Sequence, residues 1–130
     1  RIWSLKDNPE LRFMALKDFD QAMITLIKRG SVLRYAPTQL YVSDSQKVLI
    51  FGRGRFIFAL NFSPVHSFTD FEFCAPSGEY RIALNTDAKN YDGFGRIDES
   101  VHHFTSRKDG GDKLSLYLPS RSAIVLEKIR

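Results

Sequence analysis

The sequence has only one cysteine among its 130 residues, so no disulfide can form within the chain. The absence of a disulfide framework is typical of a protein from the reducing cytoplasm, which is where we expect this one to act. Cys74 stands between Phe73 and Ala75. This apolar setting predicts a buried, unreactive thiol.

Long apolar runs are also missing, and we therefore expect no membrane-spanning helix. The first residues, RIWS, lack both an initiator methionine and the apolar core of a signal peptide, so we expect the sequence to begin inside a longer protein. The net charge is only +4, and acidic residues are interleaved with the basic ones. No cationic stripe of the kind that binds nucleic acid stands out, so neither a nucleic acid nor a membrane is an expected partner.

Apolar residues, by contrast, are plentiful. They make up 43% of the chain, and 11 of them are phenylalanine. Such a composition predicts a folded domain with a dense core.

The first part of the sequence, residues 1–34, predicts one or two short α-helices. Pro9 suits a first helical position, and a short amphipathic segment follows through Leu11, Met14 and Ala15. Asp18 then predicts the N-cap of a second helix, with Gln21 completing a capping box. The apolar positions of this helix recur at helical spacing, and Gly30 ends it: Phe19, Ala22, Met23, Leu26 and Ile27. This apolar stripe packs either on the rest of the chain or on sequence upstream.

From about residue 39 the hydrophobic period changes to two, which indicates β-strands. A glycine-bearing turn at residues 52–55 predicts a hairpin between the first two strands. The predicted strands are residues 48–51, 56–62, 71–75, 80–84, 102–105, 114–118 and 123–127. Short strands with turns between them predict a mainly β fold, an antiparallel Greek-key sandwich at residues 35–130.

No arrangement of residues predicts catalysis or a metal site. Asp70 and Glu72 would share one face of a strand, a position typical of a solvated surface and not of an opposed catalytic pair. The three histidines include the neighbours His102 and His103, which would point to opposite faces of a strand. We therefore expect no catalytic residue, no metal ligand and no cofactor in this chain.

The glycine-bearing loop at residues 90–95 is the one candidate binding site. Tyr91 and Phe94 are aromatic rings in a polar loop, and such rings can stack on sugars. Asn90 and Asp92 stand beside them and could hydrogen-bond to hydroxyl groups. The alternative interpretation is that the two rings close the edge of the sandwich.

Three stretches, in this order, resemble the C-terminal all-β domain of 1,4-α-glucan (glycogen) branching enzymes of the α-amylase superfamily. The first is FIFALNFSP (56–64) running on to SFTDF (67–71). The second is GEYRIALNTDA (78–88) followed by YDGFGR (91–96), and the third is LYLPSRSAIVL (116–126). Residues 1–34 resemble the last helices of the catalytic barrel of that family.

The resemblance implies a parent enzyme that cuts an α-1,4-glucan and transfers the segment to a 6-hydroxyl group. The catalytic Asp and Glu residues of the superfamily would all lie upstream of Arg1. What remains for this chain is the role of an accessory domain. Its partners would be the catalytic barrel of the same protein and glucan or glycogen. The alternatives are a stand-alone carbohydrate-binding module and the C-terminal domain of another amylase-superfamily enzyme.

Overall fold

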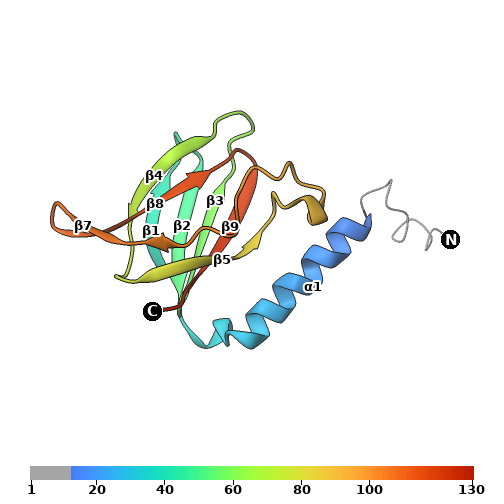
Figure 1. Cartoon of the computed structure of the whole chain (residues 1–130), viewed down its shortest axis with the longest axis horizontal. Helices are drawn as coiled ribbons and strands as arrows, with labels where there is room; N and C mark the ends of the chain where they lie inside the picture. Colours follow the sequence, from blue (N-terminus) through green and yellow to red (C-terminus); the bar gives the residue numbers. More distant parts are fainter. Residues whose placement is uncertain (1–12) are drawn as a thin grey trace.

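The computed structural model describes residues 13–130, which form one long helix and two β-sheets. Helix α1 (Phe13–Arg29) comes first and lies along one side of the larger sheet (Figure 1). All strand pairs in the described residues are antiparallel. The predicted mainly β sandwich with a helical lead-in is therefore confirmed.

The larger sheet has six strands and the smaller has three. The six-stranded sheet is ordered β1 (Thr38–Ser43), β2 (Val48–Arg53), β3 (Phe56–Asn61), β9 (Ser122–Lys128), β5 (Glu79–Asn85) and β6 (His103–Phe104). The three-stranded sheet is ordered β4 (Phe68–Cys74), β8 (Gly111–Leu118) and β7 (Ser106–Lys108). Two short 3-10 turns, η3 (Val32–Arg34) and η4 (Lys89–Tyr91), complete the described chain. Strands β2 and β3 form the predicted hairpin. Strand β1 was not among the strands predicted from the sequence.

Two apolar cores hold these layers together, and strand alternation separates them. Ile57 points between the two sheets and belongs to the larger core, together with Ile82 and Leu126. Its neighbour Phe56 points to the opposite face and belongs to a second core beneath α1. Leu26 of α1 packs in that second core. The apolar stripe of the helix therefore packs on the sandwich, which was one of the two expected outcomes.

The predicted start of the second helix is wrong. Asp18 lies inside α1 and does not cap it, because α1 already includes residues 13–17. That segment, FMALK, contains good helix formers and neither glycine nor proline, so the helix continues through Asp18. Met14 and Ala15 belong to this same helix, while Pro9 and Leu11 lie outside the described residues. The helix ends at Arg29, before Gly30, as expected.

The prediction of a buried Cys74 is also wrong, because the thiol is exposed. In β4 the side chains of Phe71 and Phe73 point into the core, so Glu72 and Cys74 point outward by alternation. Asp70 is exposed as well, although it does not follow the alternation. Its backbone has φ of 53°, and the pairing of β4 with β8 shifts register at this point. A β-bulge of this kind breaks the period of two.

Candidate functional site

The candidate site is the loop that follows β5, and its structure is organised around the carboxylate of Asp87. The backbone N–H groups of Phe94 and Arg96 donate to this carboxylate at 3.3 and 2.8 Å. The Arg96 guanidinium donates to it twice more, from Nε at 3.0 Å and from Nη2 at 2.8 Å. Asp87 is buried, so these four bonds replace its water and hold the loop in one shape.

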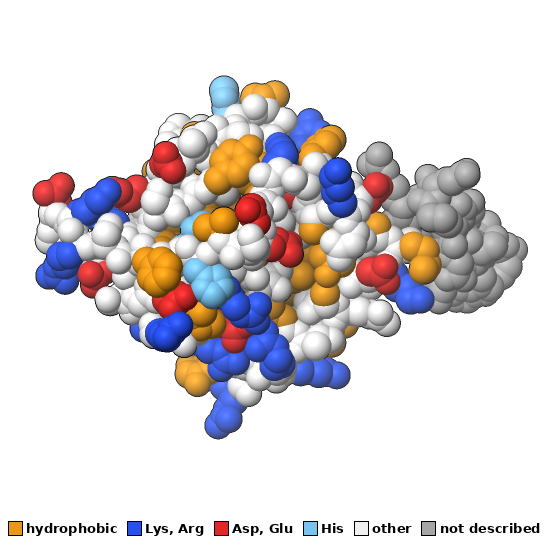
Figure 2. Space-filling model, in the orientation of Figure 1, with side chains coloured by type: hydrophobic (Ala, Val, Ile, Leu, Met, Phe, Trp, Pro, Cys, Tyr) orange, Lys and Arg blue, Asp and Glu red, His pale blue; other side chains and the backbone are white. Residues whose placement is uncertain are grey.

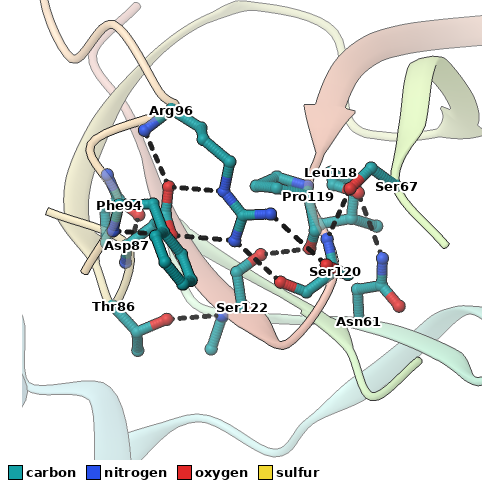
Figure 3. Close-up of polar contacts among 12 residues, drawn as sticks. Asn61, Ser67, Thr86, Asp87, Phe94, Arg96, Leu118, Pro119, Ser120 and Ser122 are labelled. Atoms are coloured by element: carbon teal, nitrogen blue, oxygen red, sulfur yellow. Dashed lines mark hydrogen bonds and ion pairs between the residues drawn. The ribbon is translucent and has the colours of Figure 1, made fainter. Parts of the chain in front are cut away.

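Arg96 also joins the loop to the corner between β8 and β9. Its Nη2 donates to the carbonyl of Ser120 at 2.9 Å, and its Nη1 donates to the Ser120 hydroxyl at 3.3 Å. Figure 3 shows the guanidinium stretched between Asp87 and Ser120. The neighbouring Arg121, by contrast, is exposed and has φ of 53°.

The electrostatics of this pair favour the charged form of both groups. Burial alone would raise the pKa of Asp87, but the hydrogen bonds from Arg96 and from the Phe94 backbone outweigh it and lower the pKa. Asp87 therefore stays ionised near neutral pH and serves as a structural anchor rather than as an acid.

Gly93 lets the loop close tightly on this anchor. A Cβ atom at Gly93 would lie 2.3 Å from the carbonyl carbon and oxygen of Asp87, a distance that no side chain tolerates. The next glycine, Gly95, donates its backbone N–H to the Asp87 carbonyl at 2.7 Å. Gly93 is thus required by the close approach of two backbone segments, and Gly95 is favoured by its φ of 68°, which residues with a side chain rarely adopt.

The four residues predicted to bind sugar lie on this loop in different settings. Phe94 is 78% exposed, and the Arg96 guanidinium lies 5.1 Å from its ring centroid. Tyr91 is half-buried and packs edge-on against Phe19 of α1, with ring centroids 5.2 Å apart. Asn90 and Asp92 are exposed. The interpretation that both rings close the sandwich edge is wrong for Phe94, while Tyr91 is a packing residue against the helix.

A shallow hollow of about 380 Å³ lies beside Tyr91, between the loop and α1. Its lining is Ala15, Leu16, Phe19, Thr86, Tyr91 and Asp92. Phe94 is not part of this hollow, so the loop presents one exposed ring and, separately, one shallow apolar recess.

The other residues considered for catalysis or metal binding form no site among residues 13–130. No group of three His, Cys, Asp or Glu side chains in this range is placed to hold a metal ion. Glu72 forms an exposed ion pair with Lys108 at 2.6 Å, and Asp70 is exposed, so these carboxylates do not flank a cleft. The Nδ1 of His102 donates a hydrogen bond to the carboxylate of Glu79 at 2.6 Å. Within the same range no helix has the length and apolar content to cross a membrane.

One polar cluster was not predicted from the sequence. The buried carboxylate of Glu127 is bound by three arginines that come from different elements, at 3.0 Å by Arg29, 2.8 Å by Arg55 and 2.7 Å by Arg81. Arg29 is the last residue of α1, so this cluster fixes the end of the helix to β9. The residues are far apart in sequence, and no local pattern signals their meeting.

The described residues thus form a β-sandwich that carries an exposed aromatic loop. The carboxylates of Asp87 and Glu127 are buried in ion pairs, whereas Asp70 and Glu72 lie on an open surface. These features define the class of the chain as a β-sandwich domain with antiparallel strands. The family described as "Alpha amylase, C-terminal all-beta domain" matches residues 41–129. This is more than half of the chain, and the chain belongs to that family.

Curated relatives match nearly the whole chain. It is 35% identical to a 1,4-alpha-glucan-branching enzyme of Saccharomyces cerevisiae, over 97% of this chain and 19% of that protein. It is 34% identical to the enzyme of the same name from Dictyostelium discoideum, over 99% of this chain and 20% of that protein. The rice 1,4-alpha-glucan-branching enzyme, chloroplastic/amyloplastic, is 39% identical over 82% of this chain and 13% of its own length. The chain therefore spans about a fifth or less of these relatives.

Proposed function

We propose that this chain is the accessory C-terminal domain of a cytoplasmic 1,4-α-glucan branching enzyme. The support is the family match together with relatives that carry this activity in their names and align along nearly the whole chain. The parent enzyme cuts an α-1,4-glucan and transfers the segment to a 6-hydroxyl group. Its catalytic carboxylates belong to sequence upstream of Arg1, and this domain supplies none.

The proposal divides the chain into a lead-in from the catalytic barrel, residues 1–34, and the sandwich, residues 35–130. The contacts of α1 explain how the first part supports the second. The helix buries Leu26 against Phe56 and Val125 of the sandwich, and its last residue, Arg29, binds Glu127. A barrel that ends in this helix is thereby fixed to the sandwich at both an apolar and an ionic contact.

We propose further that the loop after β5 holds a distal stretch of glucan. The observation that carries this step is the exposure of Phe94 on a loop that Asp87 and Arg96 fix in place. A rigid, exposed ring loses little conformational entropy when a sugar ring stacks on it. Asn90 and Asp92 lie on the same loop and supply polar groups for sugar hydroxyls, while Tyr91 mainly holds the loop against the helix.

Affinity electrophoresis in native gels containing glycogen tests the glucan contact. We expect the chain to be retarded, and the Phe94→Ala variant to lose about fivefold in affinity, the loss expected for one aromatic contact of about 1 kcal/mol. Phe104→Ala is the matched control, because Phe104 is 65% exposed and lies on β6, outside the loop. Equal retardation of all three proteins would show that Phe94 does not contact glucan. It would leave the proposed role in barrel support unaffected.

A further inference from the structure

A second hollow lies at the opposite end of the sandwich, where β9 finishes. Its volume is about 590 Å³, within the range of small-molecule sites. It lies at one end of the six-stranded sheet, and its lining combines core side chains with two cations: Tyr35, Ala36, Thr38, Leu40, Gly52, Gly54, Arg55, Phe56, Ile57, Pro76, Tyr80 and Lys128. None of these residues belongs to the loop after β5.

The inner wall of this hollow is apolar. Ile57 and Tyr80 are buried members of the main core, and Leu40 packs against them. The Tyr80 hydroxyl donates to the carbonyl of Pro76 at 2.7 Å, so its polar end is already satisfied and its ring forms part of the wall. A ligand that enters would therefore contact apolar surface and no unpaired polar group of Tyr80.

The outer wall is held in place by the turn between β2 and β3. The ring of Tyr35 lies against Gly54, where a Cβ atom would approach it to 2.7 Å. The Nε of Arg53 donates to the Tyr35 carbonyl at 2.6 Å, which fixes the backbone of this residue. Gly52 has no side chain, and this leaves room in the hollow beside Leu40.

The rim of the hollow is cationic. The backbone N–H of Lys128 donates to the carbonyl of Arg55 at 2.8 Å, so these two residues are neighbours at the mouth. Arg55 binds Glu127 through its Nε. Within residues 13–130 no acidic side chain pairs with Lys128. Lys and Arg side chains gather along the lower part of the molecule, the part where the C-terminus lies (Figures 1 and 2).

We propose that this hollow binds a small amphipathic anion, with a flat apolar body in the hollow and one carboxylate or phosphate group at the rim. The apolar walls favour the body, and Arg55 and Lys128 supply the charge complementarity. A neutral sugar chain satisfies neither requirement, so this site is distinct in its ligand chemistry from the loop that carries Phe94.

The test uses the full chain, isotope-labelled, titrated with 1-naphthoate and with the neutral analogue 1-naphthalenemethanol. Backbone amide signals of Gly52 and Gly54 report binding. We expect saturable shifts at both glycines, with naphthoate binding about three- to tenfold more tightly, since exposed ion pairs each contribute about 0.2–1 kcal/mol. Lys128→Gln should weaken naphthoate by about two- to fivefold and leave the alcohol unchanged.

Two further variants keep the outcome decisive. Gly52→Val places a side chain in the hollow from a position where a Cβ atom has ordinary contacts, so we expect a folded protein that binds neither compound. Lys17→Gln removes one exposed charge from α1 and should change nothing. Equal affinity for the acid and the alcohol would overturn the anionic part of the proposal. Naphthoate binding that survives Gly52→Val, or no shift at the two glycines, would overturn the site itself.

Discussion

The cluster around Glu127 predicts that Glu127→Gln destabilises the whole chain at neutral pH. The glutamate side chain is only 7% exposed and is bound by Arg29, Arg55 and Arg81. Glutamine keeps the size of the side chain and removes its charge. The three guanidinium groups then repel one another around a neutral amide, and α1 loses its ionic contact with β9.

The size of the effect follows from the pKa of Glu127. Burial alone would raise this pKa, but the hydrogen bonds from Arg29 and Arg55, with the charge of Arg81, lower it from 4.5 to about 2. That fall corresponds to about 3 kcal/mol of stability at neutral pH. The arginine side chains are 41–46% exposed, so water and salt screen part of the attraction. We therefore expect a loss of about 1.5–2 kcal/mol.

The pH dependence has a definite sign. Because the pKa of Glu127 is lower in the folded than in the unfolded chain, its contribution is complete above about pH 4.5 and is lost as the pH falls towards about 2. Urea unfolding followed by far-ultraviolet circular dichroism measures the free energy of unfolding across this range. The difference between the wild-type chain and Glu127→Gln should shrink to nearly zero at the acid end.

Glu72→Gln is the matched control, because Glu72 forms an exposed ion pair with Lys108 on the other sheet. We expect its unfolding to match that of the wild-type chain at neutral pH. The reasoning is refuted if Glu127→Gln unfolds at the wild-type urea concentration at neutral pH. It is equally refuted if the difference in stability persists unchanged down to about pH 2.

Three further predictions concern the loop after β5 and the exposed thiol. Asp87→Asn should lower the melting temperature and speed amide hydrogen exchange at Gly95, because the half-buried guanidinium of Arg96 loses its charged partner. Gly93→Ala should cost about 1–3 kcal/mol in urea unfolding, since its Cβ would meet the Asp87 backbone at 2.3 Å. Cys74→Ser should change the free energy of unfolding by less than about 0.5 kcal/mol, because the thiol is exposed. In the native chain Cys74 should react readily with a thiol reagent such as Ellman's reagent, and a slow reaction would contradict its exposure.

The parts of the fold that depend on local pattern could be predicted from the sequence. Phe56 and Ile57 are adjacent and face the two different cores, as a period of two requires. The stripe through Leu26 marks the buried face of α1, and Gly30 marks its end. Each of these features is determined within a few residues, which is the distance over which hydrophobic periodicity carries information.

Features that depend on the balance between local signals were predicted less well. Asp18 is a good capping residue, but the helix formers before it extend the helix past the cap. Cys74 follows three aromatic positions of β4, yet alternation places it outside with Glu72. In both cases the residue type suggested one setting, and the regular element around it imposed another.

Long-range polar contacts could not be predicted at all. Arg96 and Arg121 are both arginines near the corner at Ser120, and only the fold shows that Arg96 reaches it. The partners of Glu127 are 98, 72 and 46 positions away in the sequence. Such contacts depend on which strands become neighbours in the sheet, a property that no local period encodes. Of the candidate site, therefore, the residues could be predicted but not the buried anchor that holds them.

The two proposed binding regions lie at opposite ends of the same pair of strands. Asn85 pairs with Ile124 near the loop that carries Phe94, and Tyr80 pairs with Lys128 at the mouth of the second hollow. Strands of seven residues separate these ends by about 20 Å. Glu127 lies on the outer face of the same sheet, where it binds the end of α1. Strands β5 and β9 thus connect the ion pair between Arg29 and Glu127, the loop that carries Phe94, and the second hollow. A glucan chain on Phe94 would leave both the ion pair and the second hollow unobstructed.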